Sequence, residues 1–207
     1  MKKLFKLILA VAAVTCLNPV TAQSIDELYT LIRPTQPTAT PGKVEVIEVF
    51  SYACGGCYMF EPVIRKWLDA MPEQAEFVRM PAMFNAGWEP LGKAYYTAEK
   101  LGITQTIHPL IFEAIHKDKR QIFDDAAIRE FFIENGVDAG EYDRAANSME
   151  VKTQVRKANV MIKKYKVPST PSIVINGKYL IQPSRIRGDN GLYEVMNTLI
   201  SREQENL

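Results

Sequence analysis

The sequence predicts an α/β protein in which a block of helices interrupts the strands. Three observations support this. A β-branched and aromatic run leads into Cys54 and Cys57 and is followed by an amphipathic helix, residues 88–165 carry helical patterns, and β character returns at 171–181. With 207 residues, 47% of them apolar, the chain can form one domain or one domain with an insertion. The formal net charge of +1 and the lack of long single-sign charge runs argue against nucleic acid or an anionic membrane surface as the main partner.

Residues 1–22 are typical of a cleavable secretory signal peptide. A start with three lysines precedes a short apolar run over residues 7–14, and small residues then fit cleavage after Ala22. A membrane anchor would need roughly 20 continuous apolar residues. Lipidation at Cys16 is the alternative, although Thr15 is a poor residue before a lipidated cysteine. Cleavage removes the three lysines and lowers the formal net charge to −2.

The first part of the mature chain predicts strand, helix and strand. Residues 33–42, rich in proline, predict an extended leader, and residues 43–52 predict a buried strand that runs into Cys54. A second strand is expected over 75–84. Between the strands, apolar residues recur on one face of a helix: Phe60, Val63, Ile64, Trp67, Leu68 and Met71.

The middle of the chain predicts helices only. Two helices fill residues 88–115, and Asp124 or Asp125 caps a third that stops near Gly136. One longer helix should follow and carry these residues on its inner face: Tyr142, Ala145, Met149, Val155, Met161 and Ile162.

The last part predicts a hairpin and a helix. Asn176-Gly177 between two apolar runs favours a type I′ turn, which needs positive φ at both central positions. A final amphipathic helix is expected over 190–204.

Three interpretations of Cys54-Gly55-Gly56-Cys57 are open. A disulfide across so short a loop would stabilise the fold by roughly 2 kcal/mol, which a domain of this size does not require. A structural zinc site needs about four ligands, and the mature chain adds only His108 and His116, about two helical turns apart and pointing in diverging directions. We expect these histidines to be ordinary surface or half-buried helix residues.

The redox interpretation fits the local geometry best. At a helix N-terminus, the sulfur of Cys54 meets unpaired backbone N–H groups and the positive end of the helix dipole, which favour thiolate and lower its pKa. The thiolate is the species that attacks and leaves in disulfide exchange. Cys57, one turn further in, should be more buried and act as the resolving thiol.

Three segments together resemble the DsbA family of periplasmic thiol:disulfide interchange proteins. They are "EVFSYACGGCYMFEP", "EYDRAANSMEVKTQV" and "VPSTPSIVINGKY", and the likeness runs over residues 24–204. The resemblance implies a thioredoxin-like α/β fold, formed by residues 23–84 plus 168–207, with an inserted all-helical domain over 85–167.

The resemblance also implies further site residues. Pro171, after Thr170, matches the cis-proline that faces the redox pair and meets the substrate, with Pro168 as the rival candidate. Glu48 matches the buried acid beneath the active site, and Arg79 aligns with its basic partner. Alternation along the strand favours burial of Glu48, which would raise its pKa and suit it to shuttle protons.

The chain departs from the family's best-known members between the cysteines. Those members carry Pro-His, whereas this chain has Gly55-Gly56. Without that histidine, we expect the pKa of Cys54 to be less depressed and the couple less oxidising than in the Pro-His members.

The function implied by the resemblance is that the protein donates its Cys54–Cys57 disulfide to cysteines of newly exported proteins in the periplasm. A quinone-linked inner-membrane partner of the DsbB type would reoxidise it, with no metal or organic cofactor. The alternatives are a disulfide reductase or isomerase, and a non-catalytic chaperone-like binding module. The short leader leaves no room for the dimerisation domain of periplasmic isomerases, so we expect a monomer.

Overall fold

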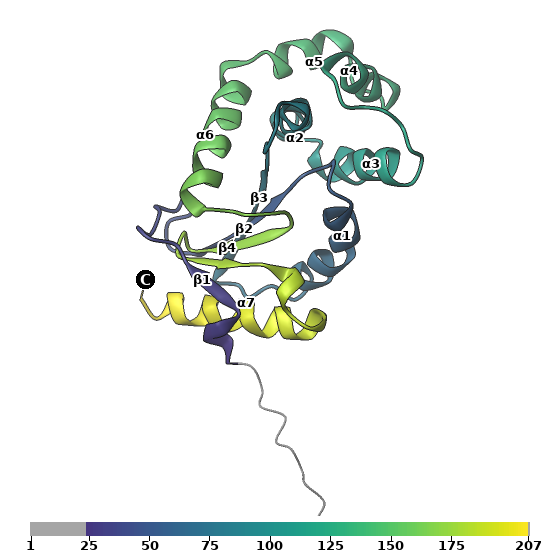
Figure 1. Ribbon diagram of the computed structural model, residues 1–207. Helices are drawn as coiled ribbons and strands as arrows, with labels where there is room; N and C mark the ends of the chain where they lie inside the picture. The colour runs from purple at the N-terminus through teal and green to yellow at the C-terminus, as the bar shows by residue number, and fades with distance from the viewer. Residues whose placement is uncertain (1–23, 207) are drawn as a thin grey trace, which may run out of the picture.

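The computed structural model describes residues 24–206 (Figure 1). The expected signal peptide, its cleavage site after Ala22 and the alternative lipidation site at Cys16 lie outside the described residues. None of the helices over 24–206 is long and apolar enough to cross a membrane.

A mixed five-stranded sheet forms the centre of the fold, in the order β1-β5-β4-β2-β3. Strands β2 and β3 are parallel, and the other neighbours are antiparallel. The strands are β1 (Tyr29–Leu31), β2 (Val44–Phe50), β3 (Ala75–Pro81), β4 (Ser172–Ile175) and β5 (Tyr179–Ile181). Every residue of β2 is buried, Glu45 and Glu48 included, because the strand lies between two others and both faces of the sheet are covered.

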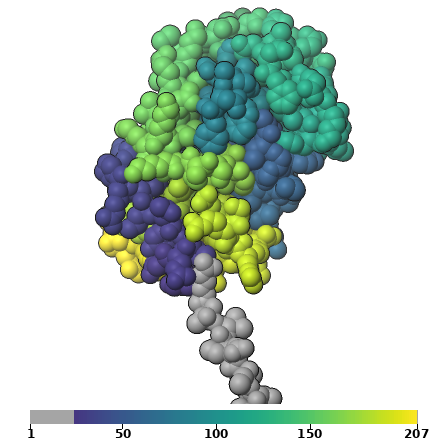
Figure 2. Space-filling model, viewed as in Figure 1, coloured from purple at the N-terminus to yellow at the C-terminus, as the bar shows by residue number. Residues whose placement is uncertain are grey.

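Seven α-helices lie within residues 24–206: α1 (Gly55–Leu68), α2 (Glu89–Lys100), α3 (Thr104–His116), α4 (Asp125–Glu134), α5 (Ala139–Ala146), α6 (Met149–Tyr165) and α7 (Gly188–Gln204). Three short 3₁₀ helices cover Ile25–Glu27, Ala86–Trp88 and Pro183–Arg185. Helices α2 to α6 gather at one end of the molecule, and α7 lies at the other end beside the sheet (Figures 1 and 2).

The two faces of the sheet pack into different cores because side chains alternate along each strand. Val46 and Ile175 pack in one core with residues of α1 and α7. Ile47, Val49 and Val174 pack in the other core, which holds most of the buried residues of α2 to α6. The predicted thioredoxin-like α/β fold with an inserted helical domain is therefore confirmed.

The predicted hairpin is confirmed. Asn176 and Gly177 have φ values of 50° and 62°, and the Lys178 N–H donates to the Ile175 carbonyl at 3.0 Å. Gly177 is required for a second reason: a Cβ there would lie 2.1 Å from the carbonyl oxygen of Gln36.

The single long helix expected after Gly136 is wrong, because two helices, α5 and α6, occupy this stretch. The Ser148 hydroxyl accepts the Val151 N–H at 3.2 Å and so caps a new helix start. Met149, expected on the inner face, is 67% exposed because it opens the first turn of α6.

The sequence interpretation also missed strand β1, which is only three residues long and pairs with β5. Residues 33–42 are tied to the hairpin rather than leading freely into the domain. The Gln36 N–H donates to the Gly177 carbonyl at 3.0 Å, and the Ile32 N–H donates to that of Lys178 at 2.8 Å.

Candidate active site

Cys54 is the N-cap residue of α1 and follows shortly after β2, which ends at Phe50. Its backbone is extended, with φ −90° and ψ 111°, and its Sγ accepts the Cys57 N–H at 3.3 Å. The Cys54 thiol also contacts the Thr170 carbonyl oxygen at 3.4 Å. A thiolate at this position receives donors that the first helical turn leaves unpaired.

The two thiols have opposite pKa shifts. Hydrogen bonds from the Cys57 thiol, the Thr170 side chain and the backbone N–H groups of Cys57 and Gly56 outweigh partial burial and lower the pKa of Cys54 to about 5. The Cys54 sulfur holds the proton on Cys57, and burial adds to this, so the pKa of Cys57 is strongly raised. Cys57 is completely buried, as the sequence predicted for the inner thiol.

Pro171 lies beside Gly56 of the redox loop. The Thr170–Pro171 peptide bond is cis, and a Cβ on Gly56 would lie 3.5 Å from Pro171 Cδ and 3.7 Å from Cys54 Sγ. Over residues 24–206 the cis bonds precede Pro34 and Pro171, and Pro168 is not among them.

Glu48 is a completely buried acid on β2, in register with Arg79 on the parallel strand β3. The Arg79 Nε donates to Glu48 Oε2 at 2.9 Å. Glu48 Oε1 is buried and has no hydrogen-bond partner in the described part of the chain. Burial raises the pKa of Glu48 to about 7, although the charge of Arg79 opposes the shift.

Glu61 and His108 extend this cluster. The sequence interpretation did not single out Glu61, and it expected no special role for His108. Arg79 Nη2 lies 3.3 Å from Glu61 Oε1, and His108 Nε2 lies 3.0 Å from the same oxygen. The other His108 nitrogen, Nδ1, is 2.9 Å from the Tyr52 hydroxyl. Burial raises the pKa of Glu61, but the hydrogen bond from His108 and the nearby positive charges outweigh it, so the net shift is downward.

The expectation of a surface or half-buried helix residue is wrong for His108 and holds for His116, which is half-buried at the end of α3. His108 is only 3% exposed, and burial lowers its pKa. Both rings contact Tyr52: His108 at the hydroxyl and His116 at the backbone carbonyl, 2.8 Å from Nε2. Eight residues are little more than two helical turns, so a tyrosine can reach both. The spacing of the two histidines does not point to Tyr52, which is 56 and 64 positions away in the sequence.

An apolar groove lies beside the cysteines. It encloses about 270 Å³, and its lining includes Gly56, Met59, Phe60, Pro171, Ile186 and Leu192. Met59 is 73% exposed, whereas Tyr52 is a core residue.

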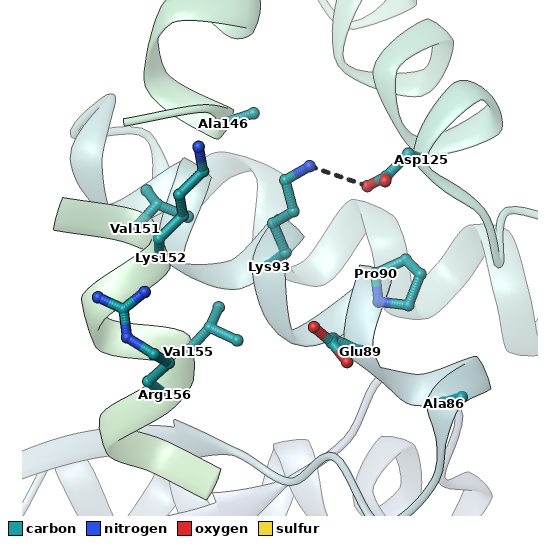
Figure 3. Close-up of a pocket in the computed structure, with 10 residues that line it drawn as sticks. All are labelled: Ala86, Glu89, Pro90, Lys93, Asp125, Ala146, Val151, Lys152, Val155 and Arg156. Carbon is teal, nitrogen blue, oxygen red and sulfur yellow. Dashed lines mark hydrogen bonds and ion pairs between the residues drawn. The ribbon is translucent and has the colours of Figure 1, made fainter. Parts of the chain in front are cut away.

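A cavity of about 400 Å³ lies between α2, α4 and α6 (Figure 3). Its polar side chains include the ion pair Lys93–Asp125 at 3.1 Å, with Lys152 and Arg156 on the facing helix. No lining residue comes from the segments that hold the cysteines or Pro171. Over residues 24–206, no three His, Cys, Asp or Glu residues are grouped as a metal ion would require.

A thioredoxin-like fold with a CxxC pair at a helix N-terminus defines the class of thiol:disulfide oxidoreductases. The family model of the DSBA-like thioredoxin domain matches residues 78–190, more than half of the chain. The thiol:disulfide interchange protein DsbA of Bordetella parapertussis is 34% identical over 197 residues, covering 95% of this chain and 94% of the relative. DsbA of Azotobacter vinelandii is 36% identical over 168 residues, covering 81% and 78%.

The crystal structure of Pseudomonas aeruginosa DsbA matches with a TM-score of 0.81 at 33% identity, covering 86% of this chain and 93% of that one. The chain belongs to the DsbA family. As a member it is a thiol:disulfide oxidoreductase that introduces disulfides through a redox-active cysteine pair rather than a cofactor.

Proposed function

We propose that Cys54 and Cys57 form the disulfide that this protein donates to cysteines of newly exported proteins. The observation that carries the proposal is Cys54 at the N-cap of α1, where donors stabilise its thiolate. Because these donors favour the reduced form, the disulfide is the less stable state and is readily given away.

The exchange runs in two steps. A substrate thiolate attacks Cys54 Sγ, forms a mixed disulfide and breaks the Cys54–Cys57 bond, so that Cys57 leaves as a thiolate. A second substrate thiolate then attacks the substrate sulfur of the mixed disulfide and releases the Cys54 thiolate. The substrate gains a disulfide by losing two electrons, and the protein becomes the dithiol.

We propose that Glu48 supplies the proton that the buried Cys57 thiolate takes up. Cys57 departs into a site that disfavours its charge, so it must take up a proton quickly. A carboxyl group with a pKa of about 7 holds a proton in about half of the molecules at neutral pH, and Glu48 Oε1 has no hydrogen-bond partner in the described part of the chain.

The substrate chain is proposed to lie in the groove beside the cysteines and to meet Thr170 and Pro171. Pro171 has no N–H, so it leaves neighbouring backbone groups free to pair with an extended peptide. The apolar lining and the exposed side chain of Met59 suit unfolded substrates, which present apolar residues.

The family and the pattern of the first 22 residues support a proposal for the cellular setting. We propose export to the periplasm with cleavage after Ala22, reoxidation by a quinone-linked membrane partner of the DsbB type, and a monomeric state. We also propose two domains, a thioredoxin-like domain over 23–84 plus 168–207 and a helical domain over 85–167.

The first test is the reduction potential of the Cys54–Cys57 couple, measured by equilibrating the mature protein in glutathione buffers. The proposal requires a potential well above that of thioredoxin. A value near thioredoxin's would instead support a reductase or isomerase, the alternative that Gly55-Gly56 favours.

Cys54→Ala separates exchange from binding. An exchange enzyme loses its activity with this substitution, whereas a chaperone-like module keeps its ability to hold an unfolded substrate. Retention of the full effect on substrate folding in Cys54→Ala would overturn the proposed chemistry.

A further inference from the structure

His116, the last residue of α3, contacts both segments that flank the redox loop, residues 54–57. Its Nε2 lies 2.8 Å from the Tyr52 carbonyl oxygen. Its ring stacks on Tyr58, with centroids 5.1 Å apart and an interplanar angle of 14°. Tyr52 lies two residues before Cys54, and Tyr58 directly follows Cys57.

The chemistry of the first contact assigns the proton. A backbone carbonyl only accepts hydrogen bonds, so Nε2 of His116 must carry hydrogen and donate it. The second contact needs only the flat face of the ring. His116 therefore connects the segment after β2 to the first turn of α1. It does so through Tyr52 and Tyr58 and not through a hydrogen bond to either thiol in the described structure.

The distance between these two segments controls the environment of Cys54. One of the contacts that stabilise the thiolate is that between Sγ and the Cys57 N–H, now 3.3 Å apart. Cys54 is carried by the segment after β2, and the donor is carried by α1. A shift of one against the other lengthens this contact, and hydrogen bonds weaken quickly with distance and misalignment.

The loop itself offers little resistance to such a shift. Two glycines have the widest backbone freedom of any dipeptide. Neither is required for space, because a Cβ on Gly55 meets nothing within 4 Å and one on Gly56 makes only ordinary contacts. A contact outside the loop therefore restrains the position of Cys54 more in this chain than it would beside a stiffer dipeptide.

Tyr52 gives that link a firm anchor. Its side chain is 1% exposed, and its hydroxyl contacts His108, also on α3, at 2.9 Å. Helix α3 therefore holds Tyr52 at both its backbone and its side chain. The inserted domain, rather than the thioredoxin-like part, supplies both contacts.

We propose that His116 is a positioning residue of the redox centre, which holds the segment before Cys54 against the first turn of α1 and thereby tunes the exchange equilibrium. This proposal concerns the same site as the proposed function and rests on Cys54 being its reactive thiol.

The test compares His116→Leu with His116→Gln. Leucine removes the donor and the flat ring, whereas the glutamine amide retains an N–H for the Tyr52 carbonyl. The readouts are the absorbance of the Cys54 thiolate at 240 nm across pH and the equilibrium constant with glutathione. In His116→Leu we expect a higher thiolate pKa and an equilibrium shifted about three- to tenfold toward the protein disulfide, the range of one lost hydrogen bond. His116→Gln should recover more than half of the shift.

A second pair of variants tests the other contact of His116, its stacking on Tyr58. Tyr58→Leu removes the stacking partner and should shift the same equilibrium in the same direction, while Tyr58→Phe keeps the ring and should match the parent. Thermal unfolding is measured on all four variants. A lower melting temperature in His116→Leu with an unchanged thiolate pKa and glutathione equilibrium would show a structural role only and overturn the proposal.

The outcome is independent of the absolute potential of the parent. A parent potential near thioredoxin's would contradict the proposed oxidant function and still leave the difference between parent and His116→Leu measurable. Equal equilibrium constants in these two proteins would overturn the positioning role and leave the oxidant function intact.

Discussion

Cys54 and Cys57 are the same residue type, three positions apart, in two different surroundings. Cys54 is partly exposed at the N-cap of α1, and hydrogen-bond donors lower its pKa to about 5. Cys57 is one turn further in, completely buried in the core that also contains the inserted helices, and its pKa is strongly raised. The comparison shows that position relative to the helix end and the core, not residue type, separates the two thiols, which supports the proposed roles of nucleophile for Cys54 and resolving thiol for Cys57.

The largest expected effect comes from removing either thiol. Cys57→Ala should react with oxidised glutathione and accumulate a mixed disulfide at Cys54, because no second thiol resolves it. Cys54→Ala should react at least roughly 10³-fold more slowly than Cys57→Ala, because only a buried, protonated thiol remains. Mass spectrometry of the adducts over time measures both rates. Equal reaction rates in the two variants would contradict the proposed difference in reactivity between Cys54 and Cys57.

Glu48→Gln tests the buried acid proposed to serve Cys57. Burial raises the pKa of Glu48 from 4.5 to about 7, so the stability associated with its neutral form is present below pH 4.5 and is lost as the pH rises to about 7. Relative to Glu48→Gln, the parent with both cysteines reduced should lose up to about 3 kcal/mol of unfolding free energy across this window. Urea unfolding at pH 4.5 and pH 8 measures the loss.

The control for that experiment is Glu76→Gln, which removes a carboxylate whose side chain is 47% exposed on β3. Its unfolding free energy should follow the pH dependence of the parent. A parallel pH dependence in parent and Glu48→Gln would show that Glu48 titrates normally in the folded protein.

Gly56→His should sharpen the difference between the cysteines. A side chain at this position fits, since its Cβ would make ordinary contacts with Pro171 and Cys54. An imidazolium near Sγ favours the thiolate, so we expect a lower thiolate pKa and an exchange equilibrium shifted about tenfold toward the reduced protein. Gly56→Gln adds a similar bulk without charge and should shift it less. Equal effects of the two substitutions would assign the shift to loop stiffness instead.

Thr170→Val should give the smallest effect. The Thr170 side chain is one of several donors that lower the pKa of Cys54, and valine removes its hydroxyl while keeping its shape. We expect the thiolate pKa to rise and the glutathione equilibrium to move about threefold toward the disulfide. Thr170→Ser keeps the hydroxyl and should stay near the parent. A Thr170→Val protein with the parent's thiolate pKa would contradict this contribution.

Local patterns were enough for much of this structure. The β-branched and aromatic run over 43–52 and the amphipathic residues after Cys57 predicted β2 and α1, and Asn176-Gly177 predicted the hairpin. The same local reasoning failed at Ser148, where a helix cap inside a continuous apolar pattern separates α5 from α6. It also failed at β1, because three residues are too few to show a period.

The sequence by itself determined the strand-to-helix junction that carries Cys54 and Cys57, because a helix N-terminus and a CxxC spacing are both local properties. Only the tertiary structure decided what surrounds them. His108 meets Glu61 across 47 positions, and His116 meets Tyr52 across 64. Such contacts depend on how α3 packs against α1 and the end of β2, and no periodicity in the chain encodes that packing. The proposed role of each thiol therefore follows from a local pattern in the sequence, while the groups that surround the thiols become visible only in the fold.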